Sequence, residues 1–226
     1  MSDLQRYVSE ELTHFTGRDK PDEDSYGLLV KIIKEELLTY PPHDKSGNLP
    51  PISIINGEAN FSSNKMINPD CVCFCDIPVN DLRIHMKKYG KFGLSFSKNF
   101  LISHGANPVF YNALNSLCGS IERGRYFNGQ MSKFNELFNQ WLREKDQDKV
   151  SLYQFLYYDI LSFFQFFDDK KNEVDFENYY MEREWRVIGD LKFKIEDIQR
   201  VIIPKEFSGR FREDVGNYYG QITFAD

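Results

Sequence analysis

The sequence predicts an α+β protein, on three observations. Apolar stretches of strand character fall into two groups, one over 71–111 and one near the carboxyl end. Helical periodicity occupies 24–38 and the interval 131–167, which lies between the strand groups. Strands and helices are therefore mixed without strict alternation. The length of 226 residues favours a single domain, 1–226, with 131–167 as a helical insertion.

A helix is predicted over 24–38, because its apolar residues recur at helical spacing and acidic residues crowd its start. The residues on that apolar face are Tyr26, Leu29, Ile33 and Leu37. Five further segments are predicted in the first half of the chain: a proline-marked loop over 41–69, strands at CVCFC (71–75), FGLSFS (92–97) and PVFY (108–111), and a short helix near 79–89.

The second half opens with a helix predicted over 131–145, whose apolar stripe consists of Phe134, Leu137, Phe138, Trp141 and Leu142. The stretch 150–167 is rich in aromatic rings and is about as long as a membrane span. Polar residues such as Asp159 and Gln165 interrupt it, which favours a buried core helix and no membrane contact. Near the carboxyl end, WRVIG, RVIIP and QITF predict three strands.

The composition excludes several classes of function. A net charge of −6 excludes a generic nucleic-acid coat, so any polyanion must meet a local basic patch. The first twenty residues contain no apolar core, so we expect no export signal, a cytoplasmic location and free thiols on the four cysteines. The P-loop, the Rossmann glycine fingerprint and the zincin and α/β-hydrolase motifs are absent.

The cysteines of the predicted strand at 71–75 are candidates for a metal site. Cys71, Cys73 and Cys75 alternate, and alternate strand residues point the same way about 7 Å apart. That spacing is too wide for neighbouring thiolates to share one tetrahedral zinc. We therefore expect buried structural thiols and no bound metal.

Basic residues cluster between Asp81 and Lys98. Four of them form the candidate phosphate-contacting set: Arg83, Lys87, Lys88 and Lys91. The cluster is explained equally by a solvated helix face or by a patch that contacts a dinucleotide or a nucleic-acid backbone.

Three stretches combine apolar strand character with polar groups: LTHFTGR (12–18), YGKFGLSFSK (89–98) and EREWRV (182–187). Together with CVCFCDIPVND and HGANPVFY, they resemble the AbiGi family of abortive phage-resistance proteins over most of the chain. The first and last stretches also resemble DarT-type ADP-ribosyltransferases. That second resemblance implies an ADP-ribosyltransferase-like split mixed sheet with flanking helices.

The DarT-type resemblance implies a toxin-like, NAD-dependent mono-ADP-ribosyltransferase of phage defence that modifies a macromolecule, with a nucleic-acid base favoured over protein as acceptor. It also implies a cognate antitoxin or another defence-system partner. Glu184 would stabilise the oxocarbenium-like state of the ribose, and Glu182 would activate the acceptor as a general base. The implied NAD-binding residues are His14, Phe15, Thr16, Gly17, Arg18, Tyr89, Ser95, Phe96 and Lys98. Among these, His14 would bind a ribose hydroxyl, Arg18 or Lys98 would face the pyrophosphate, and Tyr89 or Phe96 would stack on nicotinamide.

Non-catalytic explanations remain open. Glu182 and Glu184 alternate with Arg183 and Arg186, which is also the pattern of a salt-bridge ladder on a strand. The AbiGi resemblance implies a second function as well, because members of that family are described as the antitoxin half of a pair. The alternative is therefore a non-enzymatic antitoxin or phage-sensing module that binds a defence-system partner.

Overall fold

The computed structural model describes residues 9–40, 53–172, 175 and 178–225. The chain divides into two compact units. Unit 1 contains Met1–Pro50, Cys71–Asn107 and Glu182–Asp226, and unit 2 contains Pro51–Asp70 and Pro108–Met181. The predicted α+β class is confirmed, because a large mixed sheet is combined with helices that do not alternate strictly with its strands.

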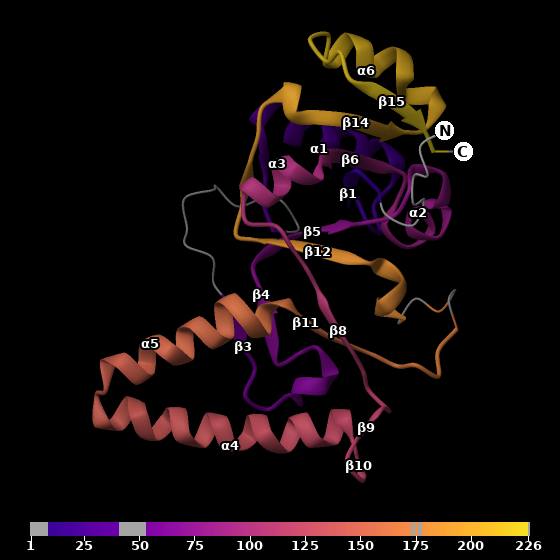
Figure 1. Cartoon of the computed structure of the whole chain (residues 1–226). Helices are drawn as coiled ribbons and strands as arrows, with labels where there is room; N and C mark the ends of the chain where they lie inside the picture. The colour runs from indigo at the N-terminus through magenta and orange to yellow at the C-terminus, as the bar shows by residue number, and fades with distance from the viewer. Residues whose placement is uncertain (1–8, 41–52, 173–174, 176–177, 226) are drawn as a thin grey trace, which may run out of the picture. The chain divides into compact units, whose positions relative to one another are not determined.

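Unit 1 is built on a sheet of order β15-β14-β6-β1-β5-β12-β7 (Figure 1). Its strands are β1 (Glu11–Thr16), β5 (Cys71–Cys75), β6 (Phe92–Ser97), β7 (Asn107–Pro108), β12 (Glu184–Ile188), β14 (Ile198–Ile203) and β15 (Gln221–Phe224). The β14–β15 pair is parallel, whereas β1 pairs antiparallel with both β5 and β6. The predicted strands at 71–75 and 92–97 and the three near the carboxyl end are confirmed.

Helices and short elements complete unit 1. The helices are α1 (Asp22–Glu35), α2 (Arg83–Tyr89), α3 (Lys98–Ser103) and α6 (Ser208–Asp214). A small antiparallel pair joins β2 (Leu37–Leu38) to β13 (Leu191–Lys192). The single-turn helices of this unit are η2 (Val79–Asp81), η6 (Ile195–Asp197) and η7 (Lys205–Phe207).

Helix α1 covers the core of unit 1 with the face that the sequence predicts. Tyr26, Leu29 and Ile33 are buried there against strand residues. The first turn of the helix contains three acidic residues, whose negative charges interact favourably with the positive end of the helix dipole. It ends at Glu35, because the backbone of the next residue, Glu36, is left-handed. The predicted end at 38 is therefore wrong, and Leu37 pairs in β2.

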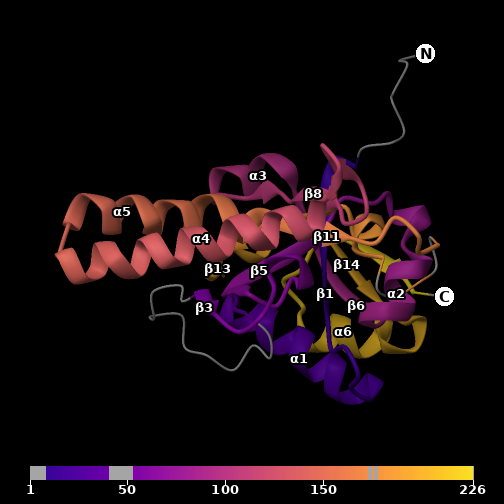
Figure 2. The same ribbon diagram turned by 90° about the horizontal axis from the view of Figure 1, so that it is seen from below.

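Unit 2 contains two long helices, α4 (Arg123–Glu144) and α5 (Gln147–Phe155), which lie side by side in both views (Figures 1 and 2). Its strands are β3 (Ser53–Ile55), β4 (Ile67–Pro69), β8 (Phe110–Ala113), β9 (Leu117–Cys118), β10 (Ile121–Glu122) and β11 (Phe164–Phe167). Single turns η1 (Phe61–Ser63), η3 (Leu156–Ile160) and η4 (Leu161–Phe163) complete it. Turn η5 (Tyr179–Glu182) ends at the first residue of unit 1's last segment.

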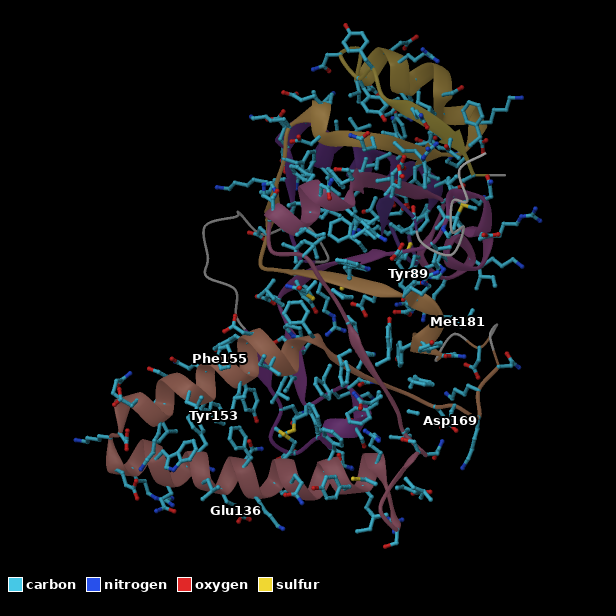
Figure 3. All side chains as sticks on the ribbon, viewed as in Figure 1. Tyr89, Glu136, Tyr153, Phe155, Asp169 and Met181 are labelled. Atoms are coloured by element: carbon cyan, nitrogen blue, oxygen red, sulfur yellow. The ribbon has the colours of Figure 1, made fainter. Side chains whose placement is uncertain are left out.

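Aromatic rings pack the core of unit 2. Tyr153 stacks on Phe138 with ring centroids 3.3 Å apart and on Tyr157 at 4.2 Å. Figure 3 shows Tyr153 between the two helices, while Glu136 lies on the outer side of α4. The buried set consists of Phe61, Met66, Met131, Tyr153, Tyr157 and Phe166. The ring-rich composition of the chain is therefore used largely for packing in this unit.

Three sequence predictions in this region need correction. The predicted helix over 150–167 is helical through Phe163, as α5 followed by η3 and η4, but its last four residues, Phe164–Phe167, form β11 and pair with β8. Helix α4 begins at Arg123, earlier than the predicted 131, because its first two turns contain too few apolar residues to show helical periodicity. The predicted loop over 41–69 contains the β3–β4 pair, and its part 41–52 lies outside the described residues.

The single-domain assignment with an insertion at 131–167 stays a prediction, and that segment lies within unit 2. Among the described residues, every helix is too short or too polar to cross a membrane.

Candidate functional site: a cavity beside β1 and β5

A cavity of about 480 Å³ lies within unit 1. Its wall is formed by β1 and the turn after it, by β5, by α2 and by the segment that enters β12. It brings together eight residues that the sequence analysis proposed for a site: His14, Phe15, Thr16, Gly17, Arg18, Tyr89, Glu182 and Glu184. Its size is in the range of pockets that bind small molecules.

The cavity lies where β1 separates from β5. These strands share one residue pair, Thr13 with Cys75, whereas β1 runs beside β6 over its full length. The imidazole of His14 lies beyond that pair, and its Nδ1 is 2.8 Å from the carbonyl oxygen of Cys73. The Cys73 carbonyl therefore pairs with a side chain of β1, where a regular β-ladder would pair it with a backbone N–H. His14 is buried in this arrangement, and its ring makes a T-shaped contact with the ring of Phe74.

The turn after β1 forms the rim of the cavity. Gly17 has a φ of 82°, and a Cβ there would lie 2.2 Å from the hydroxyl of Ser25. Glycine is therefore required for both conformation and space. The Ser25 hydroxyl donates to the Gly17 carbonyl at 3.1 Å and fixes the turn to α1. Arg18 follows on the rim and is exposed.

Glu184 is buried and bound by Arg186. The Arg186 Nε donates to Oε1 of Glu184 at 2.8 Å, and Nη2 donates to Oε2 at 3.2 Å. Both residues lie on one face of β12, opposite Cys75 and Cys73 of β5. A bidentate pair of this kind is both strong and directional, so it holds the carboxylate in one orientation.

Glu182 is the second acid of the cavity. Its Oε1 accepts hydrogen bonds from the Lys88 ammonium and the Tyr89 hydroxyl. Burial raises the pKa of Glu182, and the neighbouring charge of Glu184 adds to the rise while Lys88 opposes it. Burial and the Glu182 charge likewise raise the pKa of Tyr89, so its phenol remains a donor.

The backbone between the two acids departs from the expectation of an extended strand. Arg183 has a φ of 45°, in the left-handed region, and its carbonyl accepts from the Asp76 backbone at 3.0 Å. The strand alternation that would place Glu182 and Glu184 on one side therefore does not apply. Both acids nevertheless line the cavity, since the kink turns Glu182 toward α2.

The three cysteines of β5, Cys71, Cys73 and Cys75, line the cavity, and their spacing differs from the one expected. Cys71 Sγ and Cys73 Sγ are 3.7 Å apart, closer than the strand spacing implied, because the two side chains lean toward each other. The expectation of buried thiols holds for Cys71 and Cys75, whereas Cys73 is exposed. The hydrogen bond from Cys71 raises the pKa of the Cys73 thiol, and burial raises the pKa of Cys75 to about 12. Within the described ranges, no group of three or more His, Cys, Asp or Glu is placed to hold a metal ion.

Three predicted NAD-contacting residues lie outside the cavity lining. The Ser95 hydroxyl is buried 2.8 Å from the Thr13 hydroxyl. Phe96 is fully buried in the core, packed on Phe74, so it has no face for a ligand. Lys98 donates to Asp76 at 2.8 Å. Of the two predicted stacking rings, Tyr89 alone borders the cavity.

The predicted basic patch is smaller than its sequence suggests. Lys88 is nearly buried and bound to Glu182, so it belongs to the cavity. Lys91 lies 3.6 Å from Asp22, which offsets its charge. Arg83 and Lys87 remain as exposed cations on α2. The solvated-face and phosphate-contact explanations thus concern these two residues.

Sequence reasoning missed His85, which lies on α2 and lines the cavity. The salt-bridge ladder that the sequence offered as an alternative is present in one pair, Arg186 with Glu184, whose spacing of two places them on one face. No comparable pattern marks His85, because its place depends on how α2 packs against β1.

A family model described as "Putative abortive phage resistance protein AbiGi, antitoxin" matches residues 56–222. The chain belongs to the AbiGi family. The matched segment includes Cys71–Cys75, Tyr89, Glu182 and Glu184, whereas the segment from His14 to Arg18 precedes it.

A curated relative, the abortive phage resistance protein AbiGi of Lactococcus lactis subsp. cremoris, is 30% identical over 138 residues. The alignment covers 53% of this chain and 51% of the relative, so the chain spans about half the length of the curated AbiGi protein it matches. No solved structure matches the chain. The AbiGi part of the sequence resemblance is confirmed, and the DarT-type part stays a hypothesis.

Proposed function

We propose that this chain acts in the cytoplasm as the antitoxin of an abortive-infection system, restraining a partner by binding it rather than by modifying it. The family description supports this role. The observation that carries the proposal is the neutralised state of the cavity acids. Arg186 binds both oxygens of Glu184, while Lys88 and Tyr89 bind Glu182.

This arrangement opposes transferase chemistry for a physical reason. A carboxylate that stabilises an oxocarbenium-like state acts through negative charge directed at the ribose. The guanidinium of Arg186 offsets that charge at contact distance inside a buried site. A protein that only binds a partner can retain such a pair for its contribution to structure.

Co-expression tests the proposal. The chain is expressed in bacteria with each protein encoded beside its gene, and growth and co-purification are measured. We expect one neighbour to arrest growth alone, and this chain to relieve the arrest and co-purify with it. A Glu184→Gln chain that still folds should relieve the arrest equally. Growth arrest by this chain alone, lost on Glu184→Gln, would contradict the antitoxin role.

A mono-ADP-ribosyltransferase is the second candidate, because one cavity brings His14 together with Glu182 and Glu184. In this proposal NAD is the substrate and no metal takes part. Tyr89 borders nicotinamide, the turn at Gly17 approaches the ribose, and Arg18 meets the pyrophosphate.

The reaction would break the nicotinamide–ribose bond and join the ribose to an acceptor, with a nucleic-acid base favoured over protein. Glu184, held by Arg186, would stabilise the developing cation, and Glu182 would take the acceptor's proton. Incubation with labelled NAD and separate DNA, RNA and protein pools tests this. Glu184→Gln should lower transfer by about 100-fold or more, and His14→Ala should mainly raise KM. No NAD consumption with any pool would exclude the transferase.

A further inference from the structure

Two buried polar atoms on the cavity wall have no hydrogen-bond partner in the part of the chain that the structure describes. They are Oγ1 of Thr16 and Nε2 of His85. The two residues are 3% and 5% exposed, and both line the cavity. Buried polar groups in native proteins are almost always paired, so unpaired ones beside a cavity indicate a partner that enters it.

The state of His85 defines what that partner must offer. Its ring donates a hydrogen bond to the Glu182 backbone carbonyl, and Nε2 is the nitrogen without a partner. Burial, together with the neighbouring Lys88 charge, lowers the pKa of His85 to about 4. The ring is therefore neutral at physiological pH, and Nε2 is an acceptor that requires an N–H or O–H donor. Thr16 can either donate or accept.

The rest of the cavity adds a flat ring and two cations. Tyr89 lies beside His85, with ring centroids 6.1 Å apart (Figure 3 labels Tyr89). The Arg18 guanidinium is 5.4 Å from the Tyr89 ring centroid. Arg18 and Lys20 are both exposed and both line the cavity. The carboxylate of Asp19 lies 3.5 Å from Nε of Arg18 and partly offsets its charge, whereas Asp19 itself is outside the cavity lining. Positive charge at the rim favours an anionic group, and the ring favours a planar one.

We propose that this cavity binds a nucleotide whose amine-bearing base donates to His85 and contacts Thr16, and whose phosphate meets Arg18 and Lys20. Adenine and cytosine share this chemistry, because each carries an exocyclic amine beside a ring nitrogen. The proposal goes beyond partner binding and requires no bond to break. It also uses His85 and Thr16, which the transferase proposal does not need as a pair.

Calorimetry and thermal unfolding of the whole chain test the proposal with four probes: AMP, CMP, purine riboside 5′-monophosphate and inorganic phosphate. We expect AMP or CMP to bind and to raise Tm. Purine riboside 5′-monophosphate differs from AMP by the amine alone and should bind at least ten-fold more weakly. Phosphate alone should bind more weakly still. Failure of both AMP and CMP to bind, or equal binding of AMP and its amine-free analogue, overturns the proposal.

Variants locate the site. His85→Phe and Thr16→Val should each weaken AMP or CMP binding at least ten-fold, and Arg18→Gln should weaken the nucleotide more than its nucleoside. Arg83→Gln is the matched control, because Arg83 is exposed on the same helix as His85 but lies outside the cavity lining. Unchanged affinity in His85→Phe overturns the assignment.

If His85→Phe does not fold, His85→Asn keeps a donor for the Glu182 carbonyl and replaces it in the comparison. The amine-free analogue needs no variant at all. These measurements use neither the partner nor NAD turnover, so their failure would leave both functional proposals as they stand.

Discussion

The two units differ in what they bury. Among the described residues, every buried charged side chain belongs to unit 1: Asp76, Glu182, Glu184 and Arg186. The buried polar residues of unit 2 are neutral, and its core is an array of stacked rings. Buried charge costs free energy, so a protein retains it where structure or function requires it. Unit 1 is therefore the unit that holds the candidate functional site, whereas the stability of unit 2 comes from apolar packing.

The largest change in stability is expected when one member of a buried ion pair in unit 1 is removed. Arg186→Met takes the bidentate donor from Glu184, so unit 1 should lose about 3–5 kcal/mol of stability, as other buried pairs do when one partner is removed. Urea unfolding followed by tryptophan fluorescence measures it, because Trp185 lies between the two residues in sequence.

The control for this prediction is the double variant Glu184→Met, Arg186→Met. Two apolar side chains leave no uncompensated charge, so the double variant should recover most of the loss. Equal destabilisation of the single and double variants would mean that packing, and not charge pairing, dominates this part of unit 1.

A pH titration gives the next largest effect. The pKa of His85 is about 4 in the folded chain, against an ordinary value of 6.5. Between these values the unfolded chain binds more protons at this site. Stability from His85 is therefore present above pH 6.5 and is lost as pH falls toward 4, by about 3 kcal/mol in total.

The same titration needs a variant to isolate His85, because the raised pKa of Glu182 acts in the opposite direction. In His85→Phe the loss of stability between pH 6.5 and 4 should be smaller than in the parent chain. Identical pH profiles for the two proteins would show that the imidazole is not held neutral by its burial.

A smaller effect is expected in unit 2, where hydroxyls supplement the ring packing. The Tyr157 hydroxyl donates to Oδ1 of Asn135 at 2.6 Å, and the residue is fully buried. Tyr157→Phe keeps the stacked ring and removes this one bond, so it should cost about 1 kcal/mol. Tyr126→Phe, at an exposed ring on α4, serves as the control. A loss as large as that of Arg186→Met would contradict the view that rings stabilise this unit.

The difference between the units also explains what could be predicted from the sequence. Strands such as CVCFC and RVIIP can be predicted from the sequence, because short apolar runs bounded by turn residues are typical of buried strands. The strand at the end of the aromatic run 150–167 could not be predicted in this way, because Phe occurs in core helices and in strands. Pairing with β8 places its last four residues in a strand.

The candidate site was predictable in its residues but only partly in their pairing. His14, Glu182 and Glu184 were selected from the sequence, and one cavity holds them. The partner of Glu182 was not foreseen: Lys88 is 94 positions away and was assigned to a surface patch. Sequence periodicity shows which face a helical residue occupies, but not which distant strand that face meets.

The smallest expected effect lies on the surface of unit 1, at the two cations that the cavity leaves free on α2. Reversing both, as Arg83→Glu with Lys87→Glu, should change stability by less than about 0.5 kcal/mol, because neither side chain is buried. If they contact phosphates, binding of a single-stranded RNA should lose about 0.7 of salt slope for each contact removed. A filter-binding series over salt concentration measures this against Lys205→Glu, an exposed control outside α2. An unchanged slope would assign these cations to the solvated face of α2 and would leave the cavity as the candidate for phosphate recognition in unit 1.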